Sequence, residues 1–209
     1  MLTLGLVLQL SFNAIENQSR YEGPIVSIAD YNLTKRLSFY VNVTRNDSHQ
    51  CLKLYKNTGS VEHDSVLSDT GALINTENPE SDLCVEKANN LTLVKVQAFD
   101  YAKSGYVHLL LSFSNNDTNE IDNFIFFRKG EENFADVPVY GDTPYYFPVK
   151  IDSTADVPLV LDYYRNFLPD LLVRTGNNEF SVYRNNMNTR EDFRSCLAEN
   201  MPCFTEEPH

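Results

Sequence analysis

The sequence predicts an all-β protein in which about three similar antiparallel sheets follow one another. Short runs rich in Val, Leu, Ile, Phe and Tyr alternate with polar residues, which is the pattern of half-buried strands. Three segments also resemble one another, each with apolar residues, an Asp-Tyr pair, a short loop and a further apolar run: residues 27–41, 97–111 and 159–173. Repetition of a strand-rich unit is typical of propeller blades or an array of sheets. We therefore expect an incomplete β-propeller of about three blades.

Each unit continues with a polar turn and a second strand, so each is expected to contain a β-hairpin. The turn-and-strand pairs lie at residues 46–55, 115–127 and 176–183. A segment with three prolines, residues 136–148, is expected to link the second unit to the third. A short helical pattern occurs only at residues 189–199. We assign residues 23–92 to blade 1, residues 93–146 to blade 2, and residues 147–209 to blade 3 with a C-terminal extension.

The N-terminus and the glycosylation motifs indicate the secretory pathway. Residues 1–14 form a short apolar run that ends at a small residue, as a signal peptide does. Six Asn-x-Ser/Thr motifs follow, and so many in one short chain predict an N-glycosylated protein. They are Asn17, Asn32, Asn42, Asn46, Asn90 and Asn116. The expected location is outside the cell or in the lumen of the secretory pathway.

The four cysteines fit the same compartment, because an even count in a secreted chain indicates two disulfide bonds. They are Cys51, Cys84, Cys196 and Cys203. Three pairings are open; one of them joins Cys196 to Cys203 across a short loop and Cys51 to Cys84. A metal site built on cysteines has poor support, because the spacing contains no Cys-x-x-Cys motif.

Charge and motifs favour binding of another protein over catalysis. The net charge is −12, and no basic stripe is visible, so neither nucleic acid nor an anionic membrane surface is an expected partner. The four histidines form no His-Glu-x-x-His motif, and Gly-x-Ser-x-Gly and Gly-rich phosphate loops do not occur. No catalytic residues are assigned. We expect an extracellular or cell-surface protein receptor as the partner.

The loops after the three Asp-Tyr pairs are the candidate metal sites. Counting the Asp as position one, odd positions could supply oxygens to a calcium ion, which binds about six to eight of them. The third loop is the best supplied, with Asp162, Asn166 and Asp170. The first offers one carboxylate, Asp30, and the second ends in His108. The alternative is that each Asp accepts backbone N–H bonds within its own turn. No cofactor other than this calcium is expected.

Residues 162–173 resemble the FG-GAP repeat of integrin-α-type propellers, although Phe167 stands where that repeat has glycine. Residues 23–186 resemble the N-terminal part of the T-cell immunomodulatory protein (Linkin) family. The resemblance lies in residues 29–32, residues 99–101 with the aromatic strand 124–127, and above all residues 158–173. It implies a seven-bladed ectodomain, a C-terminal membrane anchor and a role in cell adhesion or T-cell modulation. The three units found here cannot close such a ring, and the family's anchor is not found in this chain.

Two functions are therefore carried forward. The first is a secreted or cell-surface module for protein–protein interaction. The second is a secreted carbohydrate-binding, lectin-like or carbohydrate-acting β protein that uses the aromatic run Tyr145, Tyr146 and Phe147 as a stacking platform. The alternative for that run is packing between blades.

Overall fold

The computed structural model describes residues 23–30, 38–46, 49–55, 83–86, 90–130, 134, 136–141, 143–175, 179–198 and 203–208. These residues form three four-stranded antiparallel sheets and one helix, which confirms the prediction of a mainly β fold. The first sheet contains β1 (Ile25–Ala29), β2 (Ser38–Asn46), β3 (His49–Tyr55) and β4 (Leu83–Glu86). The second contains β5 (Leu91–Phe99), β6 (His108–Asn115), β7 (Glu120–Phe126) and β8 (Val149–Thr154). The third contains β9 (Leu159–Leu161), β10 (Asp170–Arg174), β11 (Phe180–Asn185) and β12 (Phe204–Pro208).

In every sheet the strands are arranged in the order in which they occur in the chain. The three expected hairpins are confirmed: β2 pairs with β3, β6 with β7, and β10 with β11. The turn between β6 and β7 shows why the sequence folds back there. Asn119 has a φ of 58°, and Asn is one of the residues that tolerate this left-handed conformation.

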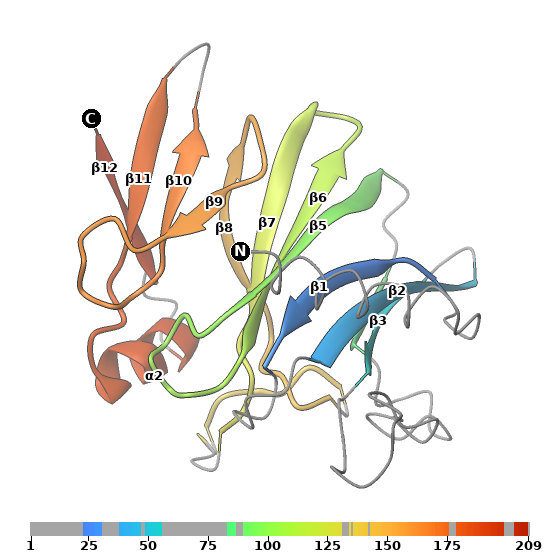
Figure 1. Ribbon diagram of the computed structural model, residues 1–209, viewed down its shortest axis with the longest axis horizontal. Coiled ribbons are helices and arrows are strands. Elements are labelled where there is room, and N and C mark those ends of the chain that lie inside the picture. The colour runs from blue at the N-terminus through green and yellow to red at the C-terminus, as the bar shows by residue number, and fades with distance from the viewer. Residues whose placement is uncertain are drawn as a thin grey trace, which may run out of the picture.

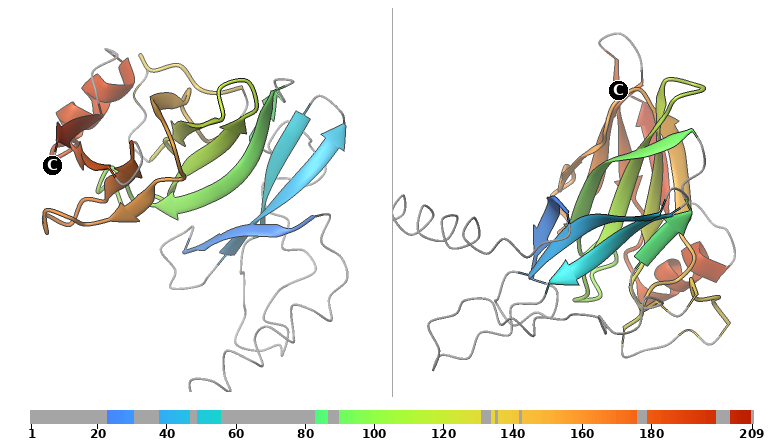
Figure 2. Two further views of the ribbon diagram at one scale, coloured as in Figure 1. Left: turned by 90° about the horizontal axis from the view of Figure 1, so that it is seen from above. Right: turned by 90° about the vertical axis from the view of Figure 1, so that its right-hand side faces the viewer.

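The second sheet lies between the other two (Figures 1 and 2). One hydrophobic core joins its odd-numbered β6 side chains, such as Leu109 and Leu111, to Tyr40 and Leu54 of the first sheet. A second core joins Leu110 to the third sheet. All of β6 from His108 to Phe113 is therefore buried, since neighbouring sheets cover both of its faces. This explains why β6 is a nearly continuous apolar run and does not alternate.

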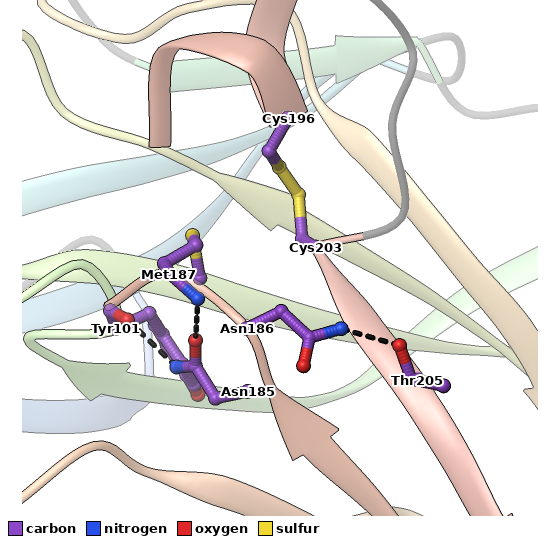
Figure 3. The surroundings of a disulfide bond; sticks show 7 residues. All are labelled: Tyr101, Asn185, Asn186, Met187, Cys196, Cys203 and Thr205. Carbon is purple, nitrogen blue, oxygen red and sulfur yellow. Dashed lines mark hydrogen bonds between the residues drawn. A yellow bond between two sulfur atoms is a disulfide. The ribbon is translucent and has the colours of Figure 1, made fainter. Parts of the chain in front are cut away.

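The helix α2 (Arg190–Ala198) confirms the single helical prediction, and its ends are fixed by specific contacts. At the N-terminus the Thr189 hydroxyl accepts the Asp192 N–H at 3.1 Å, and the Asp192 carboxylate accepts the Thr189 N–H at 2.8 Å. This reciprocal pair is a capping box. At the other end a disulfide bond joins Cys196 to Cys203 and so ties α2 to β12 (Figure 3).

The assignment of residues 136–148 as a linker between the second and third units was wrong. The segment connects β7 to β8 within the second sheet, and β8, which was placed in blade 3, pairs with β7. Backbone bonds hold the segment to that sheet: the Tyr146 N–H donates to the Phe127 carbonyl at 2.9 Å, and the Lys129 N–H donates to the Pro144 carbonyl at 2.8 Å. The three prolines therefore lie in a connection between two strands of one sheet.

Several sequence-based predictions fall outside the described residues. These are the signal peptide at residues 1–14, the glycosylation motifs at Asn17 and Asn32, and the loop after Asp30. In the described part of the chain, no helix has the length and apolar character needed to cross a membrane.

Candidate functional site: two equivalent Asp-anchored loops

The loops that join β5 to β6 and β9 to β10 repeat the same hydrogen-bond pattern. In the first of them the Asp100 carboxylate accepts the backbone N–H groups of Ser104 at 2.9 Å and Gly105 at 2.7 Å. In the second the Asp162 carboxylate accepts those of Asn166 at 2.9 Å and Phe167 at 3.0 Å. Each carboxylate thus closes its own turn, as the alternative interpretation of these loops predicted.

The same two loop positions are left-handed in both loops. Lys103 and Gly105 have φ values of 54° and 79°, and their counterparts Arg165 and Phe167 have values of 56° and 63°. Glycine adopts this conformation without strain, but a bulky side chain does so at a cost of about 1–2 kcal/mol. Phe167 is also 82% exposed, so no burial within the chain offsets that cost.

The last position of each loop starts a strand and anchors the neighbouring one. In the second sheet the His108 Nδ1 accepts the Arg128 N–H at 2.9 Å. In the third the Asp170 carboxylate accepts the Asn185 N–H at 2.9 Å, together with the N–H groups of Tyr163 and Tyr164. A histidine and an aspartate therefore fill the same structural role, which the sequence did not reveal.

Asp100, Ser104 and His108 lie together, but their geometry does not make a nucleophile–base pair. The Ser104 Oγ is 3.1 Å from the His108 Nε2 and 3.3 Å from an Asp100 oxygen. Because the His108 Nδ1 accepts a backbone N–H, the neutral ring carries its proton on Nε2. That nitrogen donates to Ser104 and cannot take its proton, as a general base would have to do.

The ionisation of these groups follows from the same contacts. Burial lowers the pKa of His108, and the nearby Asp100 carboxylate only partly offsets this effect. Burial by itself would raise the pKa of Asp100, but hydrogen bonds from His108, Gly105 and Ser104 bring it below its ordinary value. At neutral pH the cluster thus holds an ionised carboxylate beside a neutral imidazole.

The three calcium candidates of the third loop all have their oxygens engaged by backbone donors. Asp162 accepts two N–H groups, Asp170 accepts three, and the Asn166 Oδ1 accepts the Leu168 N–H at 3.0 Å. Asp170 is also fully buried. Across the described residues, no three His, Cys, Asp or Glu side chains gather as a metal site would need. The contacts suit turn closure, and calcium binding stays a prediction.

The two loops touch each other at their exposed ends. The Lys103 ammonium donates to the Asn166 carbonyl at 3.0 Å and lies 5.9 Å from the centre of the Phe167 ring. Tyr163, 46% exposed, belongs to the same loop as Arg165 and Phe167. We call Lys103, Tyr163, Arg165 and Phe167 the loop-tip surface. In the sequence Phe167 stands out only as a departure from a glycine pattern, and no local signal predicted that its ring would be exposed.

A cavity of about 450 Å³ lies beside the second-sheet loop, between it and the start of α2. Its lining includes Tyr106, Arg128, Phe134, Tyr146 and Phe193. The expected stacking platform is not formed, because Tyr145 and Tyr146 are each only 1% exposed and belong to the two cores between the sheets. Phe147 alone of the three is exposed. The two tyrosines instead pack between sheets, as the alternative interpretation of this run predicted.

The other predicted site residues lie away from these loops. Of the three cysteine pairings, the structure forms Cys196–Cys203; Cys51 is disulfide-bonded as well, and the strand register places it opposite Cys84. Among the described glycosylation motifs, Asn90 and Asn116 are exposed at turns, whereas Asn42 lies within the central strand β2. Asn46 is in β2 as well, at the end that turns toward β3.

Comparison of the chain with protein-family models, with curated proteins and with solved structures finds no match. The resemblance to the Linkin family thus stays a prediction carried by the residues quoted for it. The site must be interpreted from its own geometry.

Proposed function

We propose that this chain is an extracellular interaction module whose three sheets are blades of an FG-GAP-type propeller, and that the loop-tip surface binds a protein receptor. The observation that best supports this proposal is made at Phe167. Its aromatic side chain is 82% exposed, and its backbone is in the left-handed conformation. Strain of this kind persists where surrounding contacts hold it, and it concentrates at functional positions. Here the Asp162 carboxylate holds the Phe167 N–H directly.

The neighbours of Phe167 suit a binding surface. Aromatic and arginine side chains dominate the energetics of protein interfaces, and Tyr163 and Arg165 flank Phe167 in one loop. Lys103 bridges from the other loop and limits the freedom of the surface before a partner arrives. Rigid presentation of this kind lowers the entropy lost on binding.

Two further observations support an extracellular setting. The Cys196–Cys203 bond is of the kind that persists in oxidising compartments. The exposed turns at Asn90 and Asn116 are suitable acceptors for glycans. Cell-surface adhesion or modulation of T-cells, implied by the Linkin resemblance, is the specific role we propose.

The test is the binding of the fluorescently labelled chain to intact T-lymphocytes, measured by flow cytometry. Phe167→Gly keeps the left-handed turn and removes the aromatic ring, so we expect at least a roughly tenfold weaker apparent affinity with no loss of stability. Phe180→Ser is the matched control, because Phe180 is 53% exposed but lies on β11, outside the loop-tip surface. Equal binding by Phe167→Gly and the unmodified chain would sink the proposal.

A second candidate function, carbohydrate binding, is favoured by the cavity and not by the run at residues 145–147. The volume of the cavity lies in the range of small-molecule sites, and aromatic side chains such as Tyr106 and Phe134 form part of its lining. On a glycan array we expect selective sugar binding that Tyr106→Ala removes and Phe167→Gly leaves unchanged. An array without selective signals would eliminate this candidate and leave the first one standing.

A further inference from the structure

The cavity beside the second-sheet loop has a cationic lining, although the net charge of the chain is −12. Figure 1 shows this loop, between β5 and β6, next to α2, and residues of both line the cavity. Three of the lining residues are cationic: Lys103, Arg128 and Arg190. None of the described lining residues is an aspartate or a glutamate. The lining therefore favours an anionic ligand over a neutral or cationic one.

Two of these cations lie against aromatic rings that also line the cavity. The Arg128 guanidinium carbon is 5.4 Å from the centre of the Tyr106 ring, and the Arg190 guanidinium carbon is 5.5 Å from the centre of the Phe134 ring. Stacking of this kind restricts the orientation of each guanidinium before a ligand arrives. Both arginines have other partners within the chain as well. Because a guanidinium has five N–H donors, it can bind an oxyanion in addition to such partners.

The aromatic wall formed by Tyr106 depends on glycine at position 130. A Cβ atom at Gly130 would lie 2.7 Å from the Tyr106 Cε2, which is too close for van der Waals contact. Glycine thus allows the ring to lie directly on the backbone at the edge of the cavity. Hydroxyl and amide groups of Ser104, Asn188 and Thr189 add polar atoms to the lining. A sugar has an apolar ring face and polar edges, so it matches such a mixed lining.

The described carboxylates on the elements around the cavity have other roles. Asp100 closes its own loop, Asp192 caps α2, and Asp136 pairs with Arg194 at 2.7 Å. Residues 131–132, which follow Gly130 in the sequence, are both glutamates and lie outside the described residues. The positive lining is thus a property of the described part of the cavity, and an anion preference can be measured directly.

We propose that the cavity binds an acidic sugar, with the sugar ring on Tyr106 and the anionic oxygens held by Arg128 and Arg190. The flat fork of a guanidinium donates two parallel hydrogen bonds to the paired oxygens of a carboxylate, and it binds the oxygens of a sulfate group in the same way. The inference deepens the carbohydrate-binding candidate and rests on it. It does not involve Phe167, on which the receptor site depends.

The experiment is titration calorimetry of the full chain with matched acidic and neutral sugars. The methyl glycosides of glucuronic and galacturonic acid are compared with those of glucose and galactose, and the 6-sulfates of glucose and galactose form a third arm. We expect acidic sugars to bind at least about tenfold more tightly than their neutral counterparts. This advantage should shrink as the sodium chloride concentration rises, because salt screens the attraction. The third arm distinguishes a carboxylate ligand from a sulfated one.

Two arginine substitutions on α2 test the assignment to residues. Arg190→Gln should remove the advantage of the acidic sugars and leave the affinity for the neutral ones unchanged. Arg194→Gln is the matched control, because Arg194 lies on the same helix but pairs with Asp136 and Glu191 and does not line the cavity. It should leave both affinities unchanged. Far-UV circular dichroism checks that the variants keep their secondary structure.

Each contrary result has its own meaning. Equal affinity for acidic and neutral sugars would overturn the proposal and leave the carbohydrate-binding candidate standing; this is also the result expected if the glutamates at 131–132 neutralise the arginines. No binding of any sugar would overturn both. Acidic-sugar binding that survives Arg190→Gln, or acetate binding as tight as that of the uronic acids, would overturn the proposed arrangement of anion and ring.

Discussion

At the scale of single residues, Tyr101 shows how a repeated position can carry an unsatisfied group. Its ring fills the core between the second and third sheets, where burial raises the pKa of its hydroxyl. That hydroxyl is buried and has no hydrogen-bond partner among the described residues. The backbone carbonyl of Tyr101 does have one, the Asn185 amide at 2.7 Å (Figure 3). The unsatisfied side-chain atom at this position is therefore the Tyr101 hydroxyl oxygen.

We expect Tyr101→Phe to raise the free energy of unfolding by about 1 kcal/mol, because it removes a buried polar atom and keeps the ring. Urea denaturation measures the change. Tyr183→Phe is the comparison, since the Tyr183 hydroxyl donates to Asp152 at 3.4 Å and its removal should not stabilise the chain. A clear loss of stability in Tyr101→Phe would contradict the expectation.

His108 makes the stability of the chain depend on pH. Its pKa is lowered in the folded state by burial, so the unfolded chain takes up a proton first as the pH falls. The contribution of His108 to the free energy of unfolding is fully present above the ordinary histidine pKa of about 6.5. At lower pH it decreases by up to about 1.4 kcal/mol per pH unit. The charged groups that act on this imidazole are Asp100 and Arg128.

The measurement is urea denaturation at several pH values from neutral to mildly acidic, for the unmodified chain and for His108→Asn. The variant has no titrating group at this position, whereas all other titratable groups are common to both proteins. We expect the unmodified chain to lose more stability than the variant over this range. Parallel pH profiles would show that His108 does not titrate on unfolding.

At the scale of elements, the Asp-anchored loops are stabilised by internal donors. Asp162→Ala removes the acceptor for two backbone N–H groups, and we expect a loss of about 1–3 kcal/mol in the free energy of unfolding. Because the loop oxygens already have backbone donors, EDTA should leave the melting temperature of the unmodified chain unchanged. A melting temperature that falls with EDTA in the unmodified chain but not in Asp162→Ala would instead establish the calcium site at Asp162, Asn166 and Asp170.

The glycosylation motifs differ in the elements that hold them. Asn90 and Asn116 are exposed and adjacent, since the Asn116 N–H donates to the Asn90 carbonyl at 2.9 Å. Asn42 pairs within the first sheet, and its Oδ1 is buried. In protein secreted from animal cells we expect glycan on Asn90 and Asn116 but not on Asn42, as measured by mass spectrometry of peptides after enzymatic deglycosylation. Full occupancy of Asn42 would mean that β2 is more accessible than the structure indicates.

At the scale of the whole molecule, the position of the second sheet between two others sets where the chain is most stable. The amides of Leu109, Leu110 and Leu111 lie on a strand paired on both sides and covered on both faces. We expect them to exchange their hydrogens more slowly than the amides of β9 and β12, the edge strands of the third sheet. Native-state hydrogen exchange followed by NMR tests this ranking, which slower exchange in β9 or β12 would reverse.

The sequence by itself determined the features that depend on neighbouring residues. Alternating apolar residues predicted the strands, and Asn, Asp and Gly turns predicted the three hairpins. Residues 189–199 predicted the helix that begins after the Thr189 cap. The turn-closing role of Asp162 was also within reach, because its donors lie four and five residues away. Each of these signals arises from backbone geometry over a few residues.

Only the tertiary structure decided the features that depend on distant segments. In the tertiary structure β8 belongs to the second sheet, and Tyr145 and Tyr146 are buried. Cys203 is bonded to Cys196, and Lys103 lies within hydrogen-bond distance of the Asn166 carbonyl. The run at residues 145–147 has the same aromatic character whether it is exposed or packed between sheets. What settles its role is which surfaces cover it, and that depends on how whole sheets stack, which local patterns do not specify.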